Sequence, residues 1–159
     1  MNHPSKTTMR LVCIIIALFS YSSSQAQGDP AGFAATLPDS IKWASNPAAP
    51  GVVNAVLLGS PGKPESYVVR AKFPDAYRLM PHAHPDQRIY TVVSGTWQMG
   101  FGDNFDQSKL KLYPAGTVYV LPANTSHFNL TQGETVIQIH GVGPTATNYV
   151  NPADDPRKK

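Results

Sequence analysis

Short runs in which apolar and polar residues alternate dominate the chain after residue 50. Tyr67, Val69, Ala71 and Phe73, for example, fall on one side of an extended segment, which is the two-residue period of a half-buried strand. No apolar stripe with a 3.6-residue period continues beyond two turns, and no internal repeat is visible. The pattern predicts strands over Val52–Leu58, Ser66–Phe73, Arg88–Ser94, Thr96–Phe101, Thr117–Leu121 and Thr135–His140.

Turn-forming residues separate these runs. Asn46–Gly51 is expected to be a loop and Ser60–Lys63 a turn, and the chain holds 15 Pro and 12 Gly in 159 residues. The 42% of hydrophobic residues suffices for one packed core. Roughly six to nine short strands in one domain predict an all-β sandwich or small barrel. The barrel is expected to span 41–147, between a mobile leader (27–40) and a polar C-terminal tail (148–159) that wraps the surface.

Residues 1–26 have the layout of a secretory signal peptide. Lys6 and Arg10 precede the apolar run 11–19 (LVCIIIALF), and the small residues that follow end at Ala26. The apolar run is far shorter than the roughly 20 residues that span a bilayer as a helix. The sequence therefore predicts cleavage after Ala26, a mature protein with no membrane span, and a periplasmic or secreted location.

Cleavage would change the charge and the thiol chemistry. The formal net charge of +3 drops to +1, because Lys6 and Arg10 leave with the signal and no acidic residue does. No basic patch interleaved with aromatic residues remains, which argues against nucleic acid as a partner. The one cysteine, Cys13, also leaves, so the mature protein would have no disulfide and no thiolate ligand. A homodimer interface is one way to gain the stability that disulfides would otherwise supply.

The candidate chemistry lies in three histidines. His82 and His84 stand two residues apart, and on a strand such residues project from the same face. His127 follows a predicted strand and a turn, so it can join the pair if that strand packs nearby. Three imidazoles suit Zn, Fe, Mn, Ni or Cu and leave positions open for water or substrate. For the His-x-His pair alone, two polar surface residues are the competing interpretation.

The spacing around these histidines resembles the two motifs of the cupin family, G-x5-H-x-H-x3,4-E-x6-G and G-x5-P-x-G-x2-H-x3-N. His82-Ala83-His84 is followed by Gly95 at the first motif's interval. Gly116, Pro122, Asn124 and His127 match the second motif, with Asn124 in a glycine position, and asparagine tolerates a left-handed turn. The resemblance covers about 41–143. It implies a cupin jelly-roll β-barrel, of six to eight strands in the family, with a site in its mouth.

Two departures from the family pattern affect the predicted metal site. Arg88 stands where the family has a glutamate ligand, and a guanidinium cannot coordinate a cation. Neighbouring Asp86 either turns inward as a substitute or pairs with Arg88. Thr131 occupies the place of the second motif's terminal asparagine, although Asn129 lies close by. An inward Arg88 would also be a suitable anchor for an anionic ligand such as a carboxylate.

Four other residues are candidates for substrate binding. Gln138 and His140 share one face of a predicted strand and line the pocket if that face points inward. The competing interpretation is an exposed or hydrogen-bonded histidine at a strand end. Trp97 and Tyr119 are expected on strands and could form a pocket wall, although aromatic side chains in a small barrel are often simply core.

Two functions from different classes follow from these residues. One is a metal-dependent enzyme, and the resemblance implies dioxygenation, decarboxylation or isomerisation without choosing among them. The other is a non-catalytic barrel that binds or senses a small molecule, with or without a metal. A structural protein with a vestigial site is the third alternative.

Overall fold

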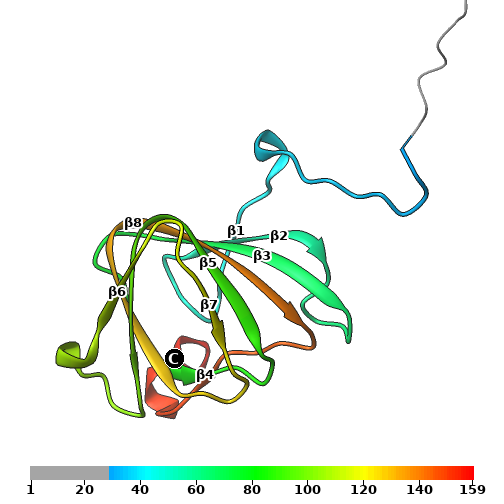
Figure 1. Cartoon of the computed structure of the whole chain (residues 1–159). Helices are drawn as coiled ribbons and strands as arrows, with labels where there is room; N and C mark the ends of the chain where they lie inside the picture. The colour runs from blue at the N-terminus through cyan, green and yellow to red at the C-terminus, as the bar shows by residue number, and fades with distance from the viewer. Residues whose placement is uncertain (1–28) are drawn as a thin grey trace, which may run out of the picture. The chain divides into compact units, whose positions relative to one another are not determined.

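The computed structural model describes residues 29–159, so the predicted signal peptide lies outside the described residues (Figure 1). Residues 34–159 form one compact unit. The leader predicted for 27–40 contains a short 3-10 helix, η1 (Pro38–Ser40). Among the described residues, no helix is long and apolar enough to cross a membrane.

Antiparallel strands make up the compact unit, which confirms the all-β prediction. Every strand pair runs antiparallel, and short 3-10 helices η2 (Gln107–Lys109), η3 (Pro152–Asp154) and η4 (Pro156–Lys158) decorate the connections and the C-terminal segment. The strands are β1 (Ala44–Ser45), β2 (Val53–Gly59), β3 (Ser66–Phe73), β4 (Arg78–Ala83), β5 (Arg88–Phe101), β6 (Lys111–Pro114), β7 (Val118–Leu121), β8 (His127–Val142) and β9 (Asn148–Tyr149).

The two long strands, β5 and β8, pair with each other along most of their length and belong to both halves of the curled sheet (Figure 1). The first part of β5 and the last part of β8 lie between β7 on one side and β3 and β2 on the other. The last part of β5 and the first part of β8 lie between β6 and β4, and β4 also pairs with β9. This arrangement curls one sheet around a common interior.

The β5–β8 pair changes direction at a glycine. Register shifts occur on either side of Ser94 in β5, where Gly95 has a φ of 75°. A Cβ at Gly95 would lie 2.4 Å from the Glu134 carbonyl oxygen of β8. Since only glycine combines this conformation with so close an approach, the glycine of the first motif is needed where the sheet bends.

The predicted strands agree with the structure in position and differ in length. Ser66–Phe73 matches β3, whereas the segments predicted on either side of Gly95 join into the single strand β5. The prediction for Thr135–His140 covers only the second half of β8. In the sequence Gly95 resembles a strand end, because it interrupts the alternation of apolar and polar residues. In the structure β5 continues past this bulge because it pairs with β8 on both sides of it. β9 lies in the segment assigned to the polar tail.

The barrel interior holds a cluster of buried side chains, and part of this cluster also lines a cavity. Strands β3, β4, β5, β7 and β8 contribute to this cluster, and Val92, Trp97, Met99 and Ile137 are each no more than 2% exposed. The full cluster is Ala49, Val52, Ala71, Phe73, Leu79, Tyr90, Val92, Trp97, Met99, Leu121 and Ile137.

Candidate metal centre and cavity

A continuous alternation places five polar and aromatic side chains inside the barrel. β4 ends at Ala83 and β5 begins at Arg88, and the chain between them keeps the inward and outward alternation of a strand. Every second side chain across this stretch is buried: His82, His84, Asp86, Arg88 and Tyr90. The alternation therefore places the two histidines and Arg88 on the same inner wall.

His127 reaches the pair through strand pairing and a turn. It is the first residue of β8 and lies opposite His82 of β4. The preceding turn contains Asn124 with a φ of 58°, the left-handed conformation expected at this glycine position. The Asn124 backbone N–H also donates to the His84 carbonyl oxygen at 2.7 Å. The register and the turn together bring the second motif against the first.

The three imidazoles are oriented by their Nδ1 atoms. Each Nδ1 lies within hydrogen-bond distance of a backbone carbonyl oxygen, which can only accept, so Nδ1 carries the proton. The acceptors are Met80 O for His82 at 2.7 Å, Ala146 O for His84 at 2.8 Å and Thr125 O for His127 at 2.9 Å. The Nε2 lone pairs are then free, and one ligand atom from each ring lies within 4.8 Å of the others.

Burial keeps these imidazoles neutral. Desolvation lowers the pKa of His82 and His84 well below the ordinary 6.5, and it lowers the pKa of His127 to about 4. The positive charge of Arg88 lowers all three pKa values further. A neutral imidazole with a free Nε2 is the form that binds a transition metal, so this donor set fits such an ion.

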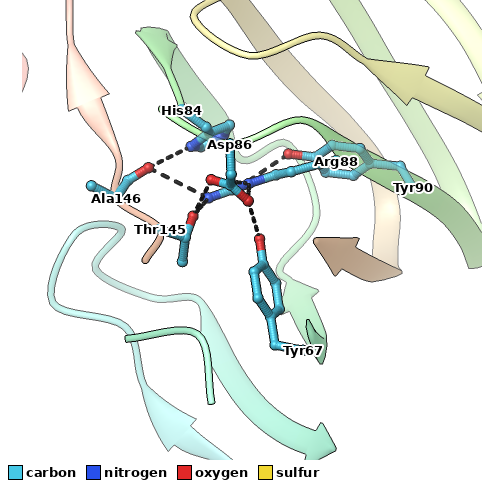
Figure 2. Close-up of polar contacts among 7 residues, drawn as sticks. All are labelled: Tyr67, His84, Asp86, Arg88, Tyr90, Thr145 and Ala146. Atoms are coloured by element: carbon cyan, nitrogen blue, oxygen red, sulfur yellow. Dashed lines mark hydrogen bonds and ion pairs between the residues drawn. The ribbon is translucent and has the colours of Figure 1, made fainter. Parts of the chain in front are cut away.

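Arg88 and Asp86 form an ion pair beside the histidines instead of supplying a fourth ligand (Figure 2). Arg88 Nε donates to both Asp86 oxygens at 3.2 and 3.3 Å, and Nη1 donates to Tyr90 Oη at 3.3 Å. Asp86 also accepts from Tyr67 Oη and from Thr145 Oγ1. Of the two alternatives for Asp86, the structure shows the pair with Arg88. Within residues 29–159, the side chains grouped so that they could hold an ion are those of the three histidines.

A cavity of about 270 Å³ lies next to the histidines. Its volume is close to the lower end for small-molecule pockets, which start at about 300 Å³. Its walls are largely apolar and aromatic, and they also include several polar side chains. The walls comprise Asn46, Ala48, Ala49, Asn54, Pro61, Tyr67, Val69, Ala71, Phe73, Leu79, His82, His84, Arg88, Tyr90, Trp97, His127, Asn129, Ile137, Ile139, Thr145, Ala146 and Thr147.

The other predicted binding residues divide between this cavity and the outer face. Trp97 lines the cavity, and its Nε1 donates to Tyr119 Oη at 3.0 Å. Tyr119 does not line the cavity and instead stacks on Tyr90, with ring centroids 5.0 Å apart. Gln138 and His140 also lie outside it, because Ile137 and Ile139 are the inward residues of β8. Strand alternation alone could not decide which face of β8 is inward.

Two buried residues of β8, Asn129 and Thr131, lie near the end of the second motif. Asn129 lines the cavity, and its Nδ2 donates to the Gln98 carbonyl oxygen at 3.3 Å. Thr131, in the family's asparagine position, is buried and accepts from the Tyr77 backbone N–H at 2.8 Å while donating to the Pro74 carbonyl oxygen. Thr131 therefore fixes the loop between β3 and β4.

Sequence reasoning missed three contributors to the site. Tyr67 comes from β3, and Thr145 and Ala146 come from the segment between β8 and β9. Tyr67 does show the alternation of an inward strand residue. Thr145 and Ala146 belong to no motif, and only the course of the chain after β8 brings them to His84 and Arg88.

The comparisons with known proteins identify the fold. No family model matches the sequence, and no curated protein matches it. KdgF from Halomonas sp. is 19% identical over 67% of this chain and 91% of that chain, with a TM-score of 0.54. An RmlC-like cupin from Shewanella frigidimarina is 16% identical over 69% and 90%, with a TM-score of 0.54.

The polyketide cyclase RemF from Streptomyces resistomycificus is similar over a larger part of the chain. It is 16% identical over 77% of this chain and 89% of that chain, with a TM-score of 0.63. Identities this low establish fold and not activity. The chain has the cupin fold, as the two motifs predicted.

Proposed function

We propose that this cupin-fold chain is an exported protein that binds one divalent transition metal through His82, His84 and His127, and a small molecule in the adjoining cavity. The observation that carries the proposal is the arrangement of the three rings: each Nδ1 is held by a carbonyl oxygen, and one ligand atom from each ring lies within 4.8 Å of the others. Iron, manganese, nickel, copper and zinc all accept such a nitrogen donor set.

The residues of this chain have definite roles in the proposal. The three carbonyl contacts hold the protons on Nδ1 and leave the lone pairs of Nε2 free to bind the metal. The apolar walls, including Trp97, Phe73 and Ile137, exclude water from the bound molecule. A bound metal supplies Lewis acidity and open coordination positions. These features serve an enzyme, and the similar fold of a polyketide cyclase supports that reading without identifying the reaction.

Metal content tests the first half of the proposal. Elemental analysis of the mature protein is expected to give about one equivalent of metal, and His82→Ala is expected to abolish it. His140→Ala is the matched control, since this histidine lies outside the cavity. Absence of metal from the wild-type protein, even after reconstitution with each of the five metals, would contradict the proposal.

Catalysis separates the enzyme from the non-catalytic alternative. If the metal takes part in chemistry, His127→Ala abolishes turnover of any substrate found in a screen of oxygenase, decarboxylase and isomerase reactions. Turnover that survives in His127→Ala rules out a metal-dependent enzyme. Ligand binding without turnover in the metal-loaded wild type supports a binding or sensing barrel.

The charge of the bound molecule is a separate question. An anionic ligand would have to share Arg88 with Asp86, because the two already form an ion pair at 3.2 Å. Benzoate and benzamide form a matched pair that differs in charge. Greater thermal stabilisation by benzoate would support the anion anchor predicted from the sequence, whereas greater stabilisation by benzamide would show that the pair leaves no free positive charge.

Export and assembly belong to the same proposal and are tested separately. The intact mass of the protein from the periplasm or medium is expected to correspond to residues 27–159. Light scattering of that material tests whether the protein forms a homodimer, one way to gain the stability that disulfides would otherwise supply. Uncleaved protein confined to the cytoplasm would contradict export without affecting the metal site.

A further inference from the structure

The contact of His84 differs in origin from those of the other two histidines. His82 and His127 each meet a carbonyl oxygen two residues earlier in the chain, so their own strands supply the acceptor. The acceptor of His84 is Ala146 O, 62 residues away. The orientation of His84 therefore depends on where the segment after β8 lies.

Arg88 contacts the same carbonyl group (Figure 2). Arg88 Nη2 donates to Ala146 O at 3.4 Å and to Thr145 Oγ1, while Ala146 O also accepts from His84 Nδ1 at 2.8 Å. A carbonyl oxygen has two lone pairs and can accept both bonds. Other backbone bonds hold Gly143 and Thr145, to Glu65 O at 3.0 Å and to Pro61 O at 2.8 Å. The contacts at the Ala146 carbonyl itself come from Arg88 and His84.

The guanidinium is held in this position from its other side. Asp86 accepts a hydrogen bond from Arg88 Nε. The Asp86 carboxylate is itself oriented by hydrogen bonds from Tyr67 Oη and from Thr145 Oγ1, the latter at 2.5 Å. Burial raises the pKa of Tyr67 to about 12, so its hydroxyl stays protonated and donates. Gly141 leaves room for this meeting, because a Cβ there would lie 2.5 Å from Tyr67 Oη and 2.7 Å from Asp86 Oδ2.

We infer that Arg88 is a positioning residue for the metal ligand His84, which it orients by holding the Thr145–Ala146 segment. The inference rests on the proposed metal site and deepens it. Arg88 stands where the family has a ligand, but it acts on the ligand His84 indirectly, through the Ala146 carbonyl group. Two opposite effects are then in competition at Arg88. Its charge repels a cation, whereas its hydrogen bonds orient a ligand, and the Asp86 carboxylate offsets the charge.

The sign of the effect on metal affinity distinguishes positioning from repulsion. Removing a residue that only repels the ion raises affinity, and removing a residue that orients a ligand lowers it by roughly 10- to 100-fold. Arg88→Met removes the charge and all the donors, and we expect Co²⁺ and Zn²⁺ affinity, measured by competition with a chelator, to fall. Arg70→Met is the matched control, since Arg70 bonds to Gln138, which lies outside the cavity.

A second variant avoids leaving Asp86 as an unpaired buried charge. Thr145→Val keeps Arg88 and Asp86 and removes the hydroxyl that both contact, and we expect a loss of affinity in the same direction. Thr145→Ser restores the hydroxyl and is expected to restore affinity. The d–d absorption spectrum of the Co²⁺ protein should change in Thr145→Val and return in Thr145→Ser. Unchanged or higher affinity in both Arg88→Met and Thr145→Val would overturn the inference.

Nuclear magnetic resonance of the imidazole nitrogens in metal-free protein separates this inference from the proposed function. In Thr145→Val and Arg88→Met the protected Nδ1–H signal of His84 is expected to be lost or shifted, while those of His82 and His127 remain. This result would support the positioning role even if the wild-type protein bound no metal. Three unchanged Nδ1–H signals would refute the role of Arg88 even if the metal site is real.

Discussion

The three histidines show how burial and hydrogen bonding act on one residue type at once. Each histidine is at most 5% exposed, and each donates a hydrogen bond from its Nδ1–H to a carbonyl oxygen. Desolvation opposes a second proton on Nε2 and is the largest cause of the lowered pKa in all three rings. The three imidazoles are therefore neutral at neutral pH, and lowering the pH decreases the stability of the folded state.

This neutrality predicts how stability depends on pH. The pKa of His127 is about 4 in the folded protein against an ordinary 6.5. Between pH 6.5 and 4, His127 is therefore protonated in the unfolded chain and neutral in the folded protein. The free energy of unfolding of the metal-free protein should fall as the pH drops from 6.5 to 4. His127 alone contributes about 3 kcal/mol of this fall, and His82 and His84 add to it.

Denaturant titrations at several pH values, with a chelator present, measure this slope. His127→Gln should make it less steep between pH 6.5 and 4, because one of the three titrating groups is gone. The control His140→Gln should leave it unchanged. An identical slope in wild type and His127→Gln would show that His127 titrates normally in the folded protein.

At the level of elements, the bend shared by β5 and β8 sets the position of the site. Gly95 allows β5 to pair with β7 before the bend and with β6 after it, so one strand belongs to both halves of the curled sheet. β8 changes neighbours in the same way, from β4 to β3. The first part of β8 thereby carries His127 to β4, while its last part leads into the Thr145–Ala146 segment.

Two glycines with similar backbone conformations test this bend. Gly95 and Gly116 have φ values of 75° and 89°, but a Cβ meets the Glu134 carbonyl oxygen at 2.4 Å only at Gly95 and nothing within 4 Å at Gly116. Gly116→Ala should cost about 1–2 kcal/mol in unfolding free energy for its left-handed conformation. Gly95→Ala should cost clearly more, because the two strands must also separate. Chemical denaturation measures both, and equal losses would contradict a close approach at Gly95.

For the whole molecule, a bound metal would join parts of the chain that are distant in sequence. His82 and His84 come from the end of β4 and the segment after it, and His127 begins β8. A ligand that binds only the folded state stabilises it by mass action. A bound metal would therefore act as a cross-link in a chain whose one cysteine is Cys13, outside the described residues.

Thermal unfolding tests this coupling. Zn²⁺ at 100 times its dissociation constant should add about 2.7 kcal/mol to the unfolding free energy and raise Tm by roughly 5–10 °C. The increase should vanish in His82→Ala and persist in His140→Ala. An equal increase in His82→Ala would place the binding of Zn²⁺ elsewhere on the protein.

Local spacing in the sequence predicted a large part of this fold and site. The alternation from Tyr67 to Phe73 predicted β3 correctly, because the apolar and polar residues of a half-buried strand themselves show which of its sides is buried. The resemblance of the segments around His82, His84 and His127 to the two cupin motifs implied that the three rings meet. Asn124 was expected in a left-handed turn and adopts it. The facing of β3 and the turn at Asn124 depend on neighbours in the chain, whereas the meeting of the three rings was predicted through the family resemblance.

Only the tertiary structure decided the features that depend on distant residues. Which face of β8 points inward, and hence that Gln138 and His140 lie outside the cavity, follows from the curl of the whole sheet. The pairing of Asp86 with Arg88 depends on Tyr67 and Thr145, which meet there because β3, β5 and the segment after β8 converge. A sequence specifies directly what adjacent residues do to one another, whereas contacts across 60 residues exist only after the chain has closed on itself.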